Sequence, residues 1–352
     1  MSTVELRGIT KRFRSVTALS DVTFSIGDGE FFILLGPTGA GKTTTLRVIA
    51  GLEKKDEGSI LFDGEAIDHL TPADRDVAFV FQQYSLYPTM TVYDNLAFPL
   101  RSPQRKTGEG EIKRIVQETA EVLRISHLLE RKTARLSGGE MQRVSIGRAI
   151  VRSPRVFLMD EPLSNLDAKL RESLRVELQH LQKDQGITTL FVTHDQIEAL
   201  TMADRIAVLE QGRIIQVGTP DDIYDQPATT FIAQLVGTPR INLFSVGRED
   251  GGIRVRESEL RIALPAGADL PQDFQLGIRP EDIQLDPDGD FSGTIELTEP
   301  LGVETILHIR SGNQTLLSTA PGMTRVKLRE QVRFRIRQDR LHCFDLAGKR
   351  LV

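Results

Sequence analysis

The sequence contains very little cysteine and no long apolar run. Its 352 residues include one cysteine, Cys343, which excludes a disulfide framework and a cysteine-rich zinc or iron–sulfur site within one chain. No apolar run approaches the roughly 18–20 residues that a membrane-spanning helix requires. The first eight residues lack the basic and then apolar layout of a secretory signal. From these absences we expect a water-soluble, cytosolic protein.

The chain also lacks an excess of positive charge. It has 44 Lys and Arg residues against 49 Asp and Glu residues, a formal net charge of −5. Such a chain has no electrostatic footprint for wrapping nucleic acid, so nucleic acid is not an expected partner. The 39% of hydrophobic and 26% of charged residues are typical of a soluble globular protein. The length predicts two domains, or one large domain with an appendage.

Short apolar runs separated by helical patterns fill the chain up to about residue 240. Five runs suit strands that are buried on both faces of a mostly parallel sheet, namely residues 31–35, 77–81, 156–159, 189–192 and 206–209. The patterns between them predict helices over residues 42–50, 111–123, 142–151 and 168–183. This alternation predicts an α/β domain.

After about residue 240 the segments become short and strand-like, with Gly and Pro between them. Apolar and charged residues alternate over residues 332–337, a pattern typical of a half-buried strand, and residues 295–297 and 306–309 are further candidates. We therefore predict a domain of residues 1–240 and a small β domain of residues 241–352, either a barrel or a sandwich.

Residues 36–43, Gly-Pro-Thr-Gly-Ala-Gly-Lys-Thr, fit the pattern G-x-x-x-x-G-K-[ST] between a predicted strand and a predicted helix. Its glycines let successive backbone N–H groups point at phosphate oxygens, beside the positive end of the following helix. A glycine-rich turn without a ligand is the alternative. We expect Lys42 to reach the β- and γ-phosphates of a nucleotide and Thr43 to ligate Mg²⁺. The expected binding residues are Gly36, Thr38, Gly39, Ala40, Gly41, Lys42, Thr43 and Thr44.

Two further predicted strands end in polar side chains. Asp160 and Glu161 follow the run 156–159, and parallel strands end beside the phosphate loop. Asp160 is therefore predicted to hold Mg²⁺, and Glu161 to orient or deprotonate the attacking water. His194 follows the run 189–192, where a neutral imidazole could bind the γ-phosphate. The alternatives are an acidic surface turn and a histidine that caps the next helix.

Residues 136–140, Leu-Ser-Gly-Gly-Glu, resemble the signature motif of the ATP-binding-cassette (ABC) ATPases. Ser137, Gly138 and Gly139 precede a helix and offer a second phosphate-binding helix N-terminus. The resemblance covers about residues 4–235. It implies an α/β P-loop NTPase cassette with a mostly parallel sheet and a helical subdomain at about residues 85–155. The sequence departs from many relatives in having Glu140 and Met141 where Gln and a basic residue are frequent.

The resemblance also implies further roles. Phe13 would stack on adenine, Gln82 would touch Mg²⁺ and the attacking water, and Asp167 would contact the opposite subunit. Glu161, His194 and Lys42 are the implied catalytic residues, with His194 as the switch histidine. The cofactors are ATP and Mg²⁺. Two chains would sandwich two ATP molecules, each between the phosphate loop of one chain and the signature residues of the other.

Residues 276–282, Leu-Gly-Ile-Arg-Pro-Glu-Asp, resemble a motif of the C-terminal OB-like β barrel (TOBE domain) in the ATPases of maltose-type sugar importers. This implies the ATP-hydrolysing homodimer of a binding-protein-dependent importer, peripheral on the cytoplasmic face of the inner membrane, with a carbohydrate as the expected solute. Its partners would be two integral-membrane permease subunits and an extracytoplasmic solute-binding protein. Residues 82–95, which include Tyr84, Tyr87 and Tyr93, would receive a permease helix.

Several other functions remain open on the sequence. The same machine could import ferric iron, a polyamine or another small solute. A soluble ABC ATPase of DNA repair or translation usually has two cassettes or a long coiled-coil insertion, and this chain has neither. A P-loop GTPase would need an Asn-Lys-x-Asp motif, which is absent. A binding module with degraded catalysis is disfavoured because Lys42, Asp160, Glu161 and His194 are all present.

Overall fold

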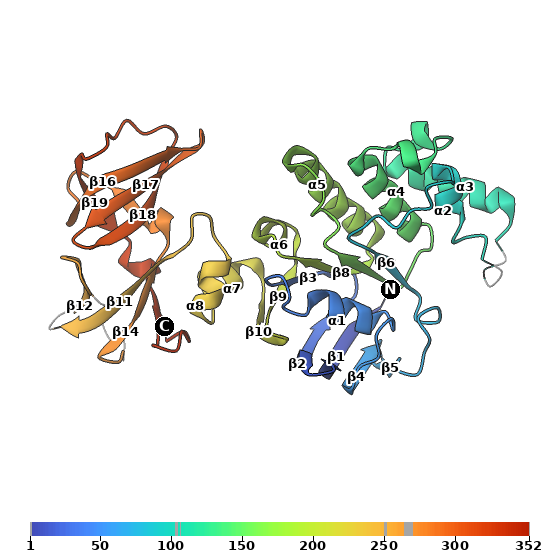
Figure 1. Ribbon diagram of the computed structural model, residues 1–352, viewed down its shortest axis with the longest axis horizontal. Coiled ribbons are helices and arrows are strands. Elements are labelled where there is room, and N and C mark those ends of the chain that lie inside the picture. The colour runs from blue at the N-terminus through green and yellow to red at the C-terminus, as the bar shows by residue number, and fades with distance from the viewer. Residues whose placement is uncertain (1, 103–104, 106, 250–251, 264–269, 352) are drawn as a thin grey trace. The chain divides into compact units, whose positions relative to one another are not determined.

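The computed structural model describes residues 2–102, 105, 107–249, 252–263 and 270–351. The chain divides into two compact units, Met1–Pro220 and Asp221–Val352 (Figure 1). The boundary between the units lies before residue 240, where the change from helical patterns to short strand-like segments suggested a domain boundary. Among the described residues, no helix is both long enough and apolar enough to span a bilayer.

A six-stranded sheet forms the centre of the first unit, in the order β10-β9-β3-β8-β7-β6. Five strands are parallel, and edge strand β10 (Arg213–Gly218) pairs antiparallel with β9. The parallel strands are β3 (Phe31–Leu35), β6 (Val77–Val80), β7 (Val156–Asp160), β8 (Thr188–Thr193) and β9 (Arg205–Glu210). Every residue of β3, β7 and β8 is buried, as the apolar runs predicted. The predicted α/β fold is therefore confirmed.

A second, antiparallel sheet in this unit has the order β2-β1-β4-β5. Its strands are β1 (Val4–Phe13), β2 (Val16–Ile26), β4 (Glu57–Phe62) and β5 (Glu65–Ala66). One apolar core joins this sheet, the parallel sheet and α1 (Lys42–Ile49). The rings of Phe24 on β2 and Phe32 on β3, for example, stack with centroids 5.2 Å apart. The shared core holds the start of α1 firmly beside the ends of the parallel strands.

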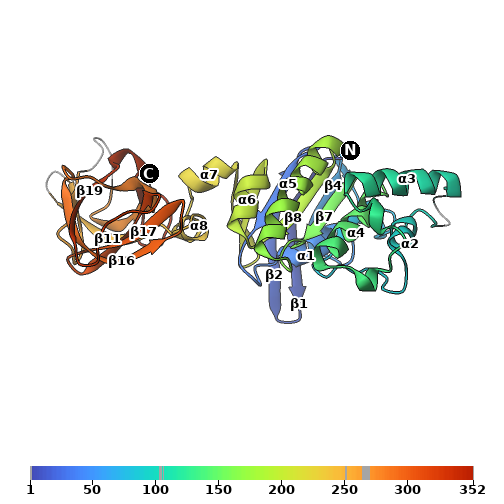
Figure 2. The same ribbon diagram turned by 90° about the horizontal axis from the view of Figure 1, so that it is seen from above.

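Helices α2 (Val92–Ala97), α3 (Glu109–Val122) and α4 (Gly138–Ile150) lie between β6 and β7 in the chain. They contact one another and form a group beside the sheet (Figure 2). Helix α5 (Ala168–Gln185) follows β7, and α6 (Gln196–Met202) follows β8. Asp167 caps α5 and Asp195 caps α6, each accepting hydrogen bonds from backbone N–H groups of the first turn.

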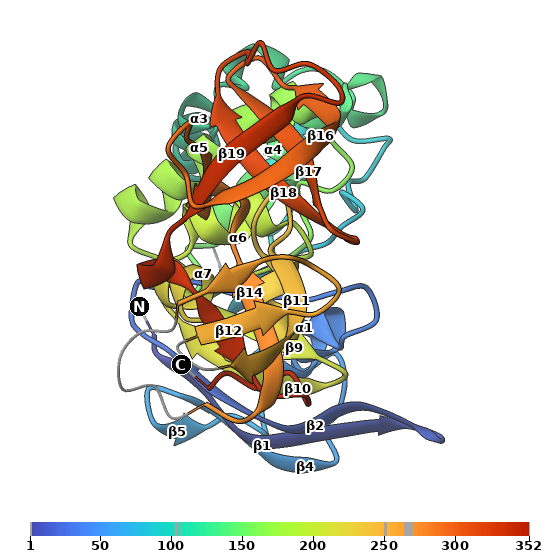
Figure 3. The same cartoon turned by 90° about the vertical axis from the view of Figure 1, so that its left-hand side faces the viewer.

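The second unit contains two five-stranded antiparallel sheets (Figure 3). One has the order β13 (Arg261–Ile262), β12 (Gly252–Val255), β11 (Asn242–Glu249), β14 (Asp273–Ile278) and β20 (His342–Phe344). The other has the order β15 (Ile283–Leu285), β19 (Gln331–Ile336), β16 (Phe291–Pro300), β17 (Glu304–Ser311) and β18 (Gln314–Pro321). A single apolar core joins the two sheets. The predicted β domain is therefore confirmed as a barrel-like, antiparallel fold.

The segment just before the β strands packs within the second unit through Arg279. Helices α7 (Pro220–Asp225) and α8 (Thr230–Leu235) form this segment. The Arg279 side chain is buried, and its guanidinium donates to the carbonyl oxygens of Tyr224, Ala233 and Val236 at 2.7, 3.1 and 2.5 Å. It also lies 4.0 Å from the centroid of the Tyr224 ring. These contacts explain why the compact unit begins at residue 221.

Candidate functional site

The phosphate loop lies between β3 and α1, where the sequence placed it. Gly36 is buried, and a Cβ atom added there would lie 2.3 Å from the backbone oxygen of Leu209, so this position requires glycine. Thr38 and Gly39 are exposed, and a Cβ added at Gly39 would meet no atom within 4 Å. The loop is thus fixed at its base and open at its tip. Ala40 is buried, and Gly41, Thr43 and Thr44 are half-buried.

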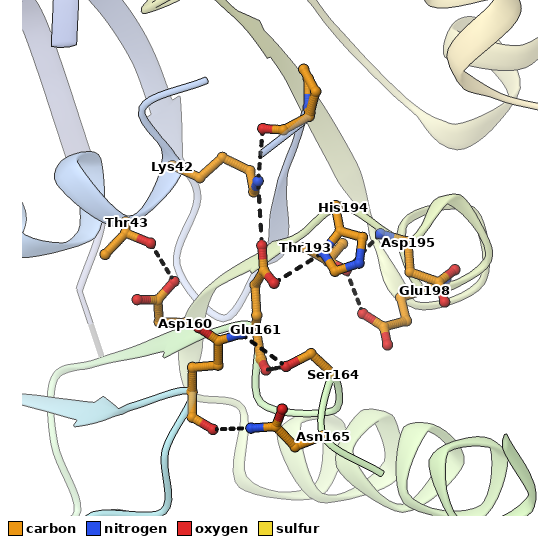
Figure 4. Close-up of polar contacts among 12 residues, drawn as sticks. Lys42, Thr43, Asp160, Glu161, Ser164, Asn165, Thr193, His194, Asp195 and Glu198 are labelled. Carbon is orange, nitrogen blue, oxygen red and sulfur yellow. Dashed lines mark hydrogen bonds and ion pairs between the residues drawn. The ribbon is translucent and has the colours of Figure 1, made fainter. Parts of the chain in front are cut away.

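Lys42 has only 4% of its side chain exposed, and its ammonium group faces the residue that follows β7. Its Nζ donates to the carbonyl oxygen of Pro37 at 3.1 Å and lies 3.3 Å from Oε1 of Glu161 (Figure 4). The other carboxylate oxygen of Glu161 lies 2.9 Å from Nδ1 of His194. Three predicted catalytic side chains therefore form a chain, Lys42 to Glu161 to His194.

The backbone explains why Glu161 and His194 meet. Glu161 directly follows β7 and adopts the left-handed region with φ of 43°, and its N–H donates to the carbonyl oxygen of Val192 on β8 at 3.0 Å. His194 directly follows β8. Because β7 and β8 are adjacent and parallel, their carboxyl ends present both side chains at the same edge of the sheet.

Thr43 and Asp160 form a second contact in the site. The Thr43 hydroxyl donates to Oδ1 of Asp160 at 2.9 Å, and Asp160 is only 6% exposed. Burial raises the pKa of Asp160 above its ordinary value, the hydrogen bond from Thr43 acting in the opposite direction. A hydroxyl and a carboxylate are hard oxygen donors of the kind that Mg²⁺ prefers. This pair therefore fits a magnesium site that phosphate oxygens would complete.

Gln82 follows β6, and its side chain is directed toward the loop after β7. Its Nε2 donates to Oγ of Ser164 at 3.4 Å, and its backbone oxygen accepts from Nδ2 of Asn165 at 3.0 Å. Gln82 is exposed. The structure thus joins Gln82 to this loop rather than to Asp160.

The signature residues begin α4 and bond to one another. Ser137 caps the helix in a capping box with Glu140, whose Oε2 accepts from the Ser137 N–H at 2.7 Å and from its hydroxyl at 2.9 Å. The backbone N–H of Ser137 lowers the pKa of Glu140. A Cβ at Gly139 would lie 2.3 Å from Cδ2 of Leu170, so Gly139 lets α4 approach α5 closely. Among the described residues, Ser137 forms hydrogen bonds with Glu140 and Met141, and none with Lys42, Glu161 or His194.

Phe13 and Asp167 lie apart from these contacts. Phe13 ends β1 with 40% of its surface exposed, and Nζ of Lys11 lies 4.6 Å from the centroid of its ring. Such an exposed ring remains free to stack on another planar group. Asp167 is exposed and accepts a hydrogen bond from the N–H of Leu170 at 3.1 Å.

Sequence reasoning missed two charged residues beside His194. Glu198 on α6 is 3% exposed, and Oε2 of its carboxylate accepts from the Thr193 hydroxyl at 2.5 Å (Figure 4). Burial raises the pKa of Glu198 to about 7. Arg171 on α5 donates to the carbonyl oxygen of Leu166 at 3.1 Å and to Oδ2 of Asp195 at 3.5 Å. No motif marks either residue, because only the folded chain shows their burial and partners.

Comparison with known proteins identifies the family. The model of the family described as ABC transporter matches residues 19–164, and that of the TOBE domain matches residues 276–344. A trehalose/maltose import ATP-binding protein of Thermococcus litoralis is 46% identical over 98% of this chain and 98% of that protein. The chain belongs to the ABC transporter family. It is an ABC ATPase with a C-terminal TOBE domain.

Other relatives of this ABC ATPase have similar names and lengths. An sn-glycerol-3-phosphate import ATP-binding protein of Psychromonas ingrahamii is 44% identical over 98% of this chain and 94% of that protein. A xylose/arabinose import ATP-binding protein of Haloferax volcanii is 42% identical with the same coverage. Among solved structures, a nucleotide-free cassette of an ABC transporter is 31% identical, covers 62% of this chain and 92% of its own, and has a TM-score of 0.56. These matches confirm the cassette fold that the resemblance implied.

Proposed function

We propose that this ABC ATPase is the ATP-hydrolysing subunit of a binding-protein-dependent importer whose solute is a carbohydrate. The contact of Glu161 with both Lys42 and His194, at 3.3 and 2.9 Å, is the observation that carries the hydrolytic part of the proposal. The relatives named for trehalose/maltose and xylose/arabinose import support the carbohydrate. A relative named for glycerol-3-phosphate import keeps a phosphorylated polyol as the second candidate solute.

Three side chains have separate roles in the proposed hydrolysis of ATP. Lys42 binds the phosphates of ATP, since its ammonium group is held at the mouth of the phosphate loop. Glu161 orients the attacking water and accepts its proton. The imidazole of His194, whose Nδ1 lies 2.9 Å from the Glu161 carboxylate, hydrogen-bonds the γ-phosphate. The phosphate competes with Glu161 for Lys42, which frees the carboxylate for the water.

Thr43 and Asp160 are the proposed holders of Mg²⁺, with Gln82 at the edge of the same site. The Thr43–Asp160 hydrogen bond already brings the two oxygen donors together. When bound, the ion neutralises charge on the β- and γ-phosphate oxygens. Asp160 keeps its position because β7 is buried along its whole length.

A homodimer is proposed because one chain offers only half of each site. Ser137, Gly138 and Gly139 start a helix whose N-terminal N–H groups suit an anion, yet the hydrogen bonds of Ser137 stay within its own helix. In the dimer these residues bind the ATP held by the phosphate loop of the other chain, Phe13 stacks on its adenine, and Asp167 contacts the partner. ATP then favours the closed dimer, because it touches both chains only in that state.

The segment 82–95 is the proposed contact with a permease helix. It borders a hollow of about 750 Å³ that Phe81, Tyr87, Phe98 and Arg148 help to line. Tyr87 and Phe98 are 39% and 47% exposed, with ring centroids 4.7 Å apart. An exposed aromatic patch of this kind is typical of a protein contact. The partners would be two permease subunits and an extracytoplasmic solute-binding protein, and the chain would lie on the cytoplasmic face of the inner membrane.

The hydrolytic part is tested with Glu161→Gln, which keeps the shape of the side chain but removes the base. We expect steady-state ATP hydrolysis to fall at least about 100-fold, and light scattering with ATP and Mg²⁺ to detect a dimer. Glu121→Gln on the exposed face of α3 is the matched control and should behave as the unchanged protein. Unchanged hydrolysis by Glu161→Gln would show that the base is misassigned, and a monomer with bound ATP would refute the sandwich.

The solute is tested by purifying the complete transporter from membranes and reconstituting it in vesicles. ATP hydrolysis and uptake are then measured with maltose, trehalose, xylose, arabinose and glycerol-3-phosphate, and with ferric iron and a polyamine. Stimulation by a sugar is the expected result. Stimulation by iron or polyamine alone would overturn the carbohydrate assignment while leaving the ATPase intact.

A further inference from the structure

A buried carboxylate that the proposed reaction does not use lies beneath His194. Glu198 is in the first turn of α6 and is 3% exposed. Carboxylates are rarely buried to this extent without a cation, because removal from water is costly. One oxygen of the Glu198 carboxylate accepts a hydrogen bond from the Thr193 hydroxyl at 2.5 Å. Such an arrangement points to a role for this side chain in holding its surroundings.

The Thr193 hydroxyl connects Glu198 to both sides of His194. It donates to Oε2 of Glu198 and accepts from the backbone N–H of Asp195 at 2.9 Å. Thr193 and Asp195 are the two neighbours of His194 in the chain. The acceptor on Glu198 therefore sets the direction of the hydroxyl, and the hydroxyl sets the backbone from which the imidazole projects.

Arg171 links the same turn to the loop that follows Glu161. Its guanidinium donates to the carbonyl oxygen of Leu166 and to the carboxylate of Asp195. A cavity of about 30 Å³ lies in this region, with room for about one water molecule. Its lining consists of Glu161, Ser164, Arg171, Thr193, His194, Asp195 and Glu198. The charged groups that face Glu198 are thus Arg171 from α5, Glu161 after β7, and His194 and Asp195 from the turn.

We propose that Glu198 is a positioning residue, whose buried carboxylate holds His194 against Glu161 through the hydroxyl of Thr193. The inference rests on the proposed ATP hydrolysis and adds a group that never touches the nucleotide. Loss of the acceptor leaves the Thr193 hydroxyl without its partner, releases the turn, and lengthens the contact between His194 and Glu161. The phosphate loop and Lys42 lie on other elements, so most of the contacts proposed to bind ATP are retained.

A protonation step accompanies this role. Because burial raises the pKa of Glu198 to about 7, its carboxyl group exchanges a proton near neutral pH. The ionised group only accepts hydrogen bonds and fixes the hydroxyl of Thr193 as donor, whereas the protonated group can itself donate. The hydrogen bond that positions His194 is therefore strongest above neutral pH. A glutamine in place of Glu198 keeps a hydrogen-bond acceptor but does not titrate.

The test compares Glu198→Ala, Glu198→Gln, Thr193→Val and the double variant Thr193→Val/Glu198→Ala across about pH 6–9. Steady-state kcat and KM for ATP are measured on the full chain, with Glu121→Gln as the control. We expect Glu198→Ala to lower kcat about tenfold, with KM within about twofold of the unchanged value. Glu198→Gln should recover most of kcat and lose the change in rate near pH 7. The double variant should be no slower than the slower single variant.

Several results would overturn the positioning role of Glu198. Equal kcat and equal pH profiles for all Glu198 variants would overturn the inference, and so would a kcat loss in Glu198→Ala that adds to that of Thr193→Val. If Glu198→Ala fails to fold, the pH profile of Glu198→Gln decides alone, since a merely structural role would leave that profile unchanged. Glu161→Gln in the same assay separates this inference from the proposed function, because its undiminished hydrolysis would show that the base is misassigned, whereas the effect of Glu198 on kcat is read from the Glu198 variants alone.

Discussion

Replacement of Arg279 by methionine tests how α7 and α8 are held in the second unit. Methionine has a similar length but no donor, so Arg279→Met leaves the carbonyl oxygens of Tyr224, Ala233 and Val236 without the guanidinium. It also removes the contact with the Tyr224 ring. The side chain is 2% exposed, so water cannot easily replace these bonds.

The expected loss of stability follows from these contacts. Hydrogen bonds to a charged group contribute about 1.5–3 kcal/mol each, and three are lost together with a cation–π contact. Burial lowers the pKa of Arg279, which reflects the cost of taking the charge out of water. That cost disappears in the variant and offsets part of the loss. We therefore expect a net loss of about 3 kcal/mol, or a fall of about 10 °C in the Tm of a unit of this size.

Differential scanning calorimetry of the full chain measures this loss, with ATP binding measured in parallel. Arg335→Met is the matched control, because Arg335 is exposed and its ion pair with Asp286 contributes about 1 kcal/mol or less. The Tm of Arg279→Lys should lie between those of Arg279→Met and Arg335→Met. An ammonium group keeps the charge but lacks the several N–H donors that a planar guanidinium holds in a fixed geometry. A Tm of Arg279→Met equal to that of Arg335→Met would refute the reasoning.

Two further predictions concern the phosphate loop and the cysteine. Gly36→Ala should weaken ATP binding at least about tenfold, because the added Cβ meets a backbone oxygen at 2.3 Å and the loop must move. Titration with a fluorescent ATP analogue measures this, and an unchanged Kd would contradict the steric reading. Cys343 is 5% exposed, and burial raises the pKa of its thiol to about 11. At about pH 8 the folded chain should therefore react with a thiol reagent about 100-fold more slowly than the chain in denaturant, and fast reaction of the folded chain would show that the thiol is accessible.

Much of the first unit could be predicted because its strands are buried on both faces. Such strands are continuous apolar runs, as in β3, whose observed bounds match the predicted residues 31–35. The phosphate loop after β3 was recognised from its sequence pattern, and the position of Asp160 and Glu161 beside it followed from the rule that parallel strands end at one edge of the sheet. The sheet of β1, β2 and β4 was missed, since its strands alternate between polar and apolar residues and carry irregular pairing.

Side-chain partnerships were harder to predict than the elements that carry them. The burial of Glu198 depends on the packing of α6 against β3 and β8, which no local pattern encodes. Likewise, Arg279 was part of a recognisable motif, but its partners lie more than 40 residues away in the chain. The position of such groups is decided by tertiary contacts rather than by local sequence.

The bond between the N–H of Glu161 and the carbonyl oxygen of Val192 means that the spacing of the site is fixed by strand length. Inserting one residue into β7 or β8 would turn every following side chain to the opposite face of the sheet. The carboxylate would then point away from the imidazole, although both residues would still be present. The chain should therefore not tolerate the insertion or deletion of a single residue in either strand.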